Sequence, residues 1–62
     1  MTANFYKMQY GNYNNSMLLA SKNIDCIPQK GNFIVFSGQL FTVDRIYFDL
    51  DNCKYNIYMA RL

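Results

Sequence analysis

Residues 31–50, GNFIVFSGQLFTVDRIYFDL, hold two apolar runs that a short turn separates. The first run covers residues 32–36 and the second covers residues 40–50, with Ser37 and Gly38 between them. Glycine readily takes the positive φ that tight hairpin turns require, and β-branched and aromatic residues favour strands. This stretch therefore predicts a β-hairpin, and we expect the rest of the chain to pack around it.

The second run changes its apolar phase by one position partway along. Its apolar positions are Phe41 and Val43 before the change, and Ile46, Phe48 and Leu50 after it. Successive side chains of a strand point to opposite faces, so a regular strand would divide these residues between two faces. One extra residue near Asp44 and Arg45, a β-bulge, would keep both sets facing inward. We therefore predict a bulge at this point, with Arg45 pointing outward.

Length and composition indicate one all-β domain that spans residues 1–62. A chain of this length buries only about 60% of the surface that its unfolded form exposes, so its core is thin. The chain is 52% apolar and 18% aromatic, whereas disordered chains are poor in aromatic residues. Glu is absent and Ala occurs three times, while Asn, Tyr, Phe and Ile are plentiful. This balance favours strands and turns over helices.

The segment before the hairpin begins with a predicted strand and turn. Residues 3–10, ANFYKMQY, predict a strand whose apolar face is the even-numbered one, with Tyr6, Met8 and Tyr10. Residues 11–16, GNYNNS, predict a turn, because Gly and Asn tolerate left-handed backbone conformations. Tyr13 lies in this turn, which is either a contact surface or a solvated connector.

The other segments complete a five-stranded pattern. Residues 17–22, MLLASK, predict a second strand, with a single helical turn as the alternative. Residues 23–31 contain Pro28 and predict an irregular connection. Residues 49–53 predict a turn, and residues 54–62 predict a last strand with alternating faces. One face of that strand holds Tyr55, Ile57 and Met59, and the other holds Lys54, Asn56 and Tyr58.

Two cysteines, Cys26 and Cys53, could pair and close a long loop. Nothing in the sequence points to an oxidising compartment, since the N-terminus lacks the features of a signal peptide and no apolar run approaches membrane-spanning length. We therefore expect reduced thiols, no membrane association and a cytoplasmic location. Two thiols without any His fall short of the four ligands of a zinc site.

The spacing of turn and core residues resembles a known family. The matching positions are Pro28-x-x-Gly31-Asn32-x-Ile34-x-Phe36-x-Gly38-x-x-Phe41-x-Val43-x-x-Ile46, followed by Phe48-Asp49 and an alternating strand. This pattern, over about half the chain, resembles small SH3-like β-proteins encoded by bacteriophages and other mobile elements, with Asn32 in place of the usual acidic residue. The resemblance implies a small five-stranded SH3-like barrel or a strongly bent antiparallel sheet. It also implies a mobile-element origin, and some small phage proteins of this type antagonise host defence systems.

The sequence offers little for catalysis. It has no His, no Glu and no Trp, so acid–base chemistry would rest on four Asp residues, two Cys and the tyrosines. Asp49 and Asp51 flank a turn that lacks the further oxygen ligands of a calcium loop. Neither cysteine has a neighbouring base. We therefore expect no enzymatic activity, no cofactor and no metal.

The surplus of aromatic residues points to binding. One small core cannot cover all six tyrosines, and Tyr is favoured at interfaces because it joins a large apolar face to a polar tip. The leading hypothesis is a phage or mobile-element protein that binds and inhibits a host defence protein. The candidate partner-binding residues are Tyr10, Tyr13, Arg45, Tyr47, Tyr55 and Tyr58.

The alternative hypothesis is a small β-barrel that binds single-stranded nucleic acid. In it, bases would stack on Tyr47, Tyr55 and Tyr58, and phosphates would contact Arg45, Lys54 and Arg61. The net charge of +2 is mild, and the basic residues are scattered rather than clustered. Self-association through unprotected edge strands could accompany either function, because the chain begins and ends in apolar strands.

Overall fold

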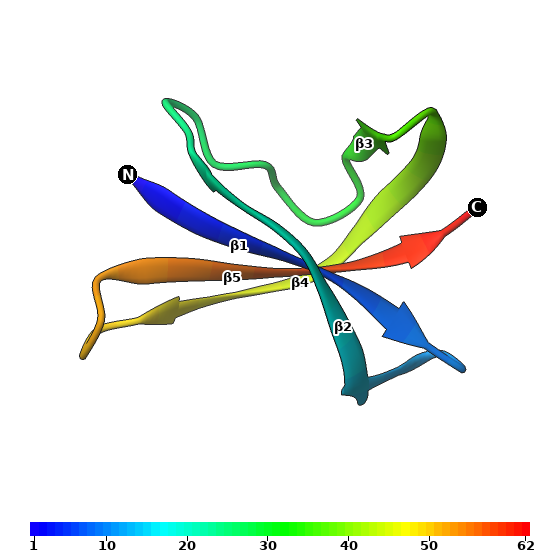
Figure 1. Cartoon of the computed structure of the whole chain (residues 1–62), viewed down its shortest axis with the longest axis horizontal. Coiled ribbons are helices and arrows are strands. Elements are labelled where there is room, and N and C mark those ends of the chain that lie inside the picture. The colour runs from blue at the N-terminus through cyan, green and yellow to red at the C-terminus, as the bar shows by residue number, and fades with distance from the viewer.

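A computed structural model describes the backbone of all 62 residues and every side chain except that of Tyr13. The chain forms five strands and no helix (Figure 1). The strands are β1 (Thr2–Gln9), β2 (Asn12–Asn23), β3 (Phe33–Phe36), β4 (Gln39–Asp49) and β5 (Lys54–Arg61). They form one sheet in the order β2-β1-β5-β4-β3, which twists so strongly that it curls into a half-barrel. The predicted all-β class and small bent-sheet architecture are confirmed.

The sheet is mixed and not wholly antiparallel as predicted, because the interior strands β1 and β5 run parallel. β1 and β5 pair from Thr2 opposite Lys54 to Lys7 opposite Met59, while the other three pairs are antiparallel. The strands at the two ends of the chain are therefore the interior of the sheet. The free edges belong to β2 and β3, so the expectation that the terminal strands would present open edges was wrong.

The hairpin between β3 and β4 forms as predicted. Phe36 lies opposite Gln39, which leaves Ser37 and Gly38 as a two-residue turn. Both turn residues have positive φ, 50° and 74°. Positive φ at both central positions defines the type I′ turn, whose twist matches that of the flanking strands.

The β-bulge in β4 also lies where the sequence predicts it. Val43 is opposite Met59 and Arg45 is opposite Tyr58, so Asp44 is the extra residue. Phe41 and Val43 are buried before the bulge, and Ile46 packs against the same core after it. The bulge thus keeps Phe41, Val43 and Ile46 on one face. Phe48 shares that face but is half exposed, and the predicted inward placement of Leu50 was wrong, since Leu50 lies in the exposed turn after β4.

The first hairpin is tighter than the sequence suggests. Its turn is only Tyr10 and Gly11, both with positive φ, and β2 already starts at Asn12. The register slips here, since Met8 lies opposite Ser16 whereas Gln9 lies opposite Asn12. The Asn-rich residues are therefore an irregular start of the strand instead of a separate loop. Residues 17–22 are strand, as predicted, and not a helical turn.

The core lies on the inner face of the half-barrel. Its fully buried members are Ala3, Phe41, Val43, Ile57 and Met59. The core side of β1 is the odd-numbered face, because Phe5 lies opposite the buried Ile57. The prediction that the even face of β1 is the apolar one holds for Met8, which is buried, but fails for Tyr6, which lies on the outer face opposite Tyr58.

Candidate binding face

The outer face of the sheet carries three aromatic rings and one arginine that lie close together. We call this cluster the tyrosine face, and its members are Tyr6, Tyr47, Tyr58 and Arg45. These residues lie on the three neighbouring strands β1, β4 and β5. The Tyr6 and Tyr58 rings stack with centroids 4.9 Å apart and an interplanar angle of 13°. The Tyr47 ring meets Tyr58 edge-on, with centroids 5.9 Å apart and an angle of 74°. Each of these pairs has a favourable aromatic geometry.

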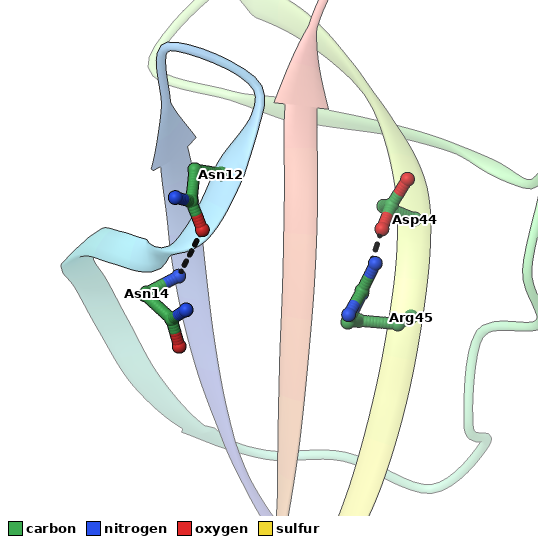
Figure 2. A network of polar contacts seen from close by, with 4 residues as sticks. All are labelled: Asn12, Asn14, Asp44 and Arg45. Atoms are coloured by element: carbon green, nitrogen blue, oxygen red, sulfur yellow. Dashed lines mark hydrogen bonds and ion pairs between the residues drawn. The ribbon is translucent and has the colours of Figure 1, made fainter.

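Arg45 owes its place on this face to the bulge. Neighbouring side chains of a regular strand point to opposite faces, yet Arg45 Nε donates a hydrogen bond to Asp44 Oδ2 at 2.9 Å. The extra residue turns both side chains to the same side (Figure 2). The hydrogen bond to Asp44, and a second one to the Tyr47 hydroxyl, raise the pKa of Arg45 above its ordinary value. The guanidinium therefore stays charged, is held in one orientation, and has the Asp44 carboxylate as its counter-ion.

A polar ladder lies beside the rings on the same face. Asn4 Nδ2 donates to Asn56 Oδ1 at 3.2 Å, and Ser21 Oγ donates to Asn4 Oδ1 at 2.5 Å. These three residues lie directly opposite one another across β2, β1 and β5. The ladder gives the tyrosine face a polar border whose hydrogen bonds are already satisfied, as in the rim of a protein interface.

The structure brings together some of the residues predicted from sequence and separates others. Arg45, Tyr47 and Tyr58 share the outer face. Tyr55 lies on the inner face, where its ring contacts Phe48 with centroids 4.8 Å apart. Tyr10 stands alone in the first hairpin turn and is 95% exposed. The side chain of Tyr13 lies outside the described part of the chain.

Tyr6 belongs to the tyrosine face although it is not among the residues predicted to bind a partner. Its membership follows from the parallel pairing of β1 with β5, which sets Tyr6 opposite Tyr58. The sequence signal for it is weak, because Phe5 and Tyr6 are adjacent aromatics and either could face the core. Only the pairing of two strands that are distant in sequence decides between them.

Two clefts adjoin the sheet. The first has a volume of about 480 Å³ and lies beside the bulge, lined by Gln29, Lys30 and the β4 residues from Asp44 to Tyr47. It lies just beyond Val43, where the last hydrogen bonds join β4 to Gly31 and Asn32. The second has a volume of about 200 Å³ and lies between β2 and β3. Its lining is apolar apart from Lys22.

The basic residues do not concentrate on the tyrosine face. Arg45 and Lys54 lie on the outer side, whereas Lys7 and Lys22 lie opposite the core residues Met59 and Ala3. Arg61 lies opposite Phe41, also on the inner side. Lys30, the sixth basic residue, lines the cleft beside Arg45 and Tyr47. The rings of the tyrosine face are therefore accompanied by one guanidinium that Asp44 already pairs, with one lysine at the border of the face.

The side chains that could bind a metal or act as a nucleophile or base lie apart from one another in the described part of the chain. Across the described residues, His, Cys, Asp and Glu never gather in a group of three that could hold a metal ion. Cys26 and Cys53 are both exposed and unpaired. Asp49 accepts hydrogen bonds from the side chain and backbone of Asn52, which lower its pKa. No helix in the described part of the chain is long and apolar enough to cross a membrane.

The chain was compared with protein families, curated proteins and solved structures. No protein-family model matches the chain, and neither the curated proteins nor the solved structures include a significant match. The tyrosine face is the candidate site because it joins several half-exposed rings, an oriented charge and a polar border on three adjacent strands.

Proposed function

We propose that this chain is a non-enzymatic protein-interaction module that docks on its partner through the tyrosine face. The observation that carries the proposal is the packing of Tyr6 and Tyr47 against Tyr58 on the outer side of the sheet. Stacked rings on a sheet lose little conformational entropy on binding. Arg45, held by Asp44, adds an oriented donor of the kind enriched at binding hot spots.

A protein partner fits this face better than a nucleic acid does. Non-specific binding of nucleic acid depends on several free Lys or Arg side chains that contact phosphates. The single guanidinium among these rings already has Asp44 as a counter-ion, and three of the remaining basic residues lie on the inner side of the sheet. The polar border of Asn4 and Asn56 resembles a protein-interface rim more than a phosphate track.

The partner that we propose is a host protein, most directly a component of a bacterial defence system, which the chain would inhibit by occupying its surface. The support for this class is the resemblance of residues 28–49 to small SH3-like proteins of phages and mobile elements. A rigid domain of 62 residues can block a surface without any chemistry of its own. Its location would then be the cytoplasm of the host cell.

The test pairs two face variants with a matched surface control. Tyr47→Ser and Arg45→Ala remove one ring and one charge from the tyrosine face, and Leu50→Ser changes an exposed residue of the β4–β5 turn. The tagged wild-type chain captures proteins from bacterial lysate, and the captured protein is then purified and titrated with each variant. We expect a stoichiometric complex that weakens at least tenfold in both face variants, that Leu50→Ser leaves intact, and whose formation inhibits the partner.

Two results would overturn this proposal. One is the recovery of no stoichiometric partner from lysate. The other is a complex that Tyr47→Ser and Arg45→Ala leave unchanged, while Tyr10→Ser, in the first hairpin turn, abolishes it. The second result would move the binding site to the isolated and fully exposed ring of Tyr10.

The second candidate function is binding of single-stranded nucleic acid, which the shared face of Arg45, Tyr47 and Tyr58 favours. Fluorescence anisotropy of a labelled oligothymidylate at low salt tests it, with Tyr58→Ser as the ring variant. Binding that weakens steeply with salt and is lost in Tyr58→Ser would replace the protein partner with a nucleic acid. We expect no measurable binding.

A further inference from the structure

The two free edges of the sheet differ in how they are protected. β2 carries Lys22, a register slip at Leu19 and several Asn residues, which are features that discourage pairing with another chain. β3 has the sequence FIVF, with no charge, no proline and no bulge. The cleft of about 200 Å³ separates β3 from β2, so β2 does not pair with this edge. β3 is therefore the edge open to another strand.

The register of the hairpin identifies the backbone groups on the open edge. Hydrogen-bonded and non-hydrogen-bonded pairs alternate along an antiparallel pair, and the residues that close a two-residue hairpin, Phe36 and Gln39, bond to each other. Even-numbered residues of β3 therefore bond toward β4. The bond from Val43 N–H to the Asn32 carbonyl, at 2.9 Å, continues this alternation. The N–H and C=O groups of Phe33 and Val35 consequently point away from β4.

The side chains at this edge suit a second copy of the same chain. Phe33 and Val35 are 68% and 71% exposed, and Leu40, opposite Val35, is also exposed. Residues 31–43 carry no charged side chain. A twofold interface sets each residue near its own copy or a close neighbour, so a charge there would repel itself unless the interface supplied a counter-charge. A stretch without charges avoids this repulsion.

We propose that two copies of the chain associate by antiparallel pairing of β3 with β3 of the second copy. In the register that we infer, Phe33 lies opposite Val35 of the other copy, and Ile34 lies opposite its own counterpart. This register uses all four free backbone groups, because Phe33 and Val35 exchange both of their hydrogen bonds in each of the two equivalent pairs. It also places an aromatic residue opposite a β-branched one on the outer face, which is a favourable cross-strand pair.

The small exposed area indicates a weak dimer. If a side chain of this class presents roughly 150 Å² when fully exposed, then Phe33, Val35 and Leu40 together offer on the order of 300 Å² per copy, against the ~800 Å² per partner of a standard interface. Four backbone hydrogen bonds add to this area. The dimer is therefore weak, with an expected dissociation constant of about 10 µM to 1 mM.

Sedimentation equilibrium over a concentration series tests the proposal with variants matched across the two edges. Val35→Lys and Phe33→Lys each introduce a charge on β3, and Leu18→Lys introduces the same charge at an exposed position of β2. Circular dichroism establishes that each variant is folded. We expect the wild type and Leu18→Lys to dimerise with the same constant, and both β3 variants to bind at least tenfold more weakly.

Three outcomes would overturn the proposal. The first is a wild-type chain that shows no dimer at about 1 mM, the weak limit of the expected range, where at least about half of the chains should be paired. The second is dimerisation that Val35→Lys and Phe33→Lys leave unchanged. The third is dimerisation that only Leu18→Lys abolishes, which would assign it to β2. The first two results do not bear on the tyrosine face, because its rings lie on β1, β4 and β5. The third result would bear on it, because Leu18 lies opposite Tyr6.

Discussion

Asp44 determines which side chains of β4 lie on the outer face of the sheet. As the extra residue of β4, it turns Val43 inward and Arg45 outward, and its carboxylate then accepts the hydrogen bond from Arg45. Without the bulge, Ile46 and Arg45 would exchange faces, and the guanidinium would meet the core. One residue thus sets both the apolar content of the inner face and the charge of the tyrosine face.

Substitutions of the two neighbours of Asp44 should therefore differ strongly in their effect on the free energy of unfolding. Val43→Asp buries a carboxylate without a partner, so we expect a loss of about 3 kcal/mol or more in the free energy of unfolding. A domain of this size has roughly 3–9 kcal/mol in total, so the variant should be largely unfolded. Arg45→Ala removes an exposed ion pair and should change that free energy by less than about 0.5 kcal/mol. Urea denaturation measures both, and near-equal effects would contradict the placement of the bulge.

Asp49 should make stability depend on pH. Hydrogen bonds from the Asn52 side chain, and then from its backbone N–H, hold the pKa of Asp49 below its ordinary value of 3.8. A carboxyl whose pKa is lowered by folding stabilises the fold above that ordinary value. The contribution is lost as the pH falls through the lower, folded pKa.

The variant Asp49→Asn should therefore lose part of the decline in stability that acid causes in the wild type. Thermal denaturation between about pH 5 and pH 2, the range around the ordinary pKa of an Asp, measures this decline. Asn52→Ala removes the side-chain donor but keeps the backbone N–H, so it should flatten the curve less than Asp49→Asn does. Curves that run parallel for all three proteins would show that the turn contributes nothing to this dependence.

The β3–β4 hairpin is the element whose formation depends most on local sequence. Gly38 has a φ of 74°, and a Cβ added there would meet no atom within 4 Å, so any cost of substitution is conformational. We expect Gly38→Ala to destabilise the fold by about 1 kcal/mol. Ser37→Gly, which places glycine at the other positive φ of the turn, should be neutral or slightly stabilising. Denaturation midpoints compare the two, and an equal loss in both would exclude the type I′ turn.

Local elements could be predicted from the sequence, and pairing between distant strands could not. The hairpin turn at Ser37–Gly38 and the bulge at Asp44 leave local signals, namely a glycine between apolar runs and a slip in apolar phase. The parallel pairing of β1 with β5 joins residues more than fifty positions apart, and no local pattern specifies it. The face of β1 depends on that pairing, which is why the inward placement of Tyr6 was wrong.

At the scale of the molecule, a thin core leaves many rings outside. The half-barrel buries Phe41 and Ile57 but can cover only one side of a strongly twisted sheet. The tyrosines on the other side therefore stay outside the core. The candidate site exists because the half-barrel leaves this side of the sheet uncovered. The sequence predicted Arg45, Tyr47 and Tyr58 for it. Alternation along the last strand had already set Tyr55 beside Ile57 and Met59, on the face away from Tyr58, and Tyr55 indeed lies inward against Phe48.

The most direct test of the tyrosine face is a nuclear magnetic resonance titration of the isotopically labelled chain with its purified protein partner. We predict that the largest shift changes map to Tyr6, Arg45, Tyr47 and Tyr58, on the outer side of β1, β4 and β5. The first hairpin turn at Tyr10 should change little. Changes confined to that turn, or to the inner residues Phe48 and Tyr55, would contradict the proposal that the chain binds through its tyrosine face.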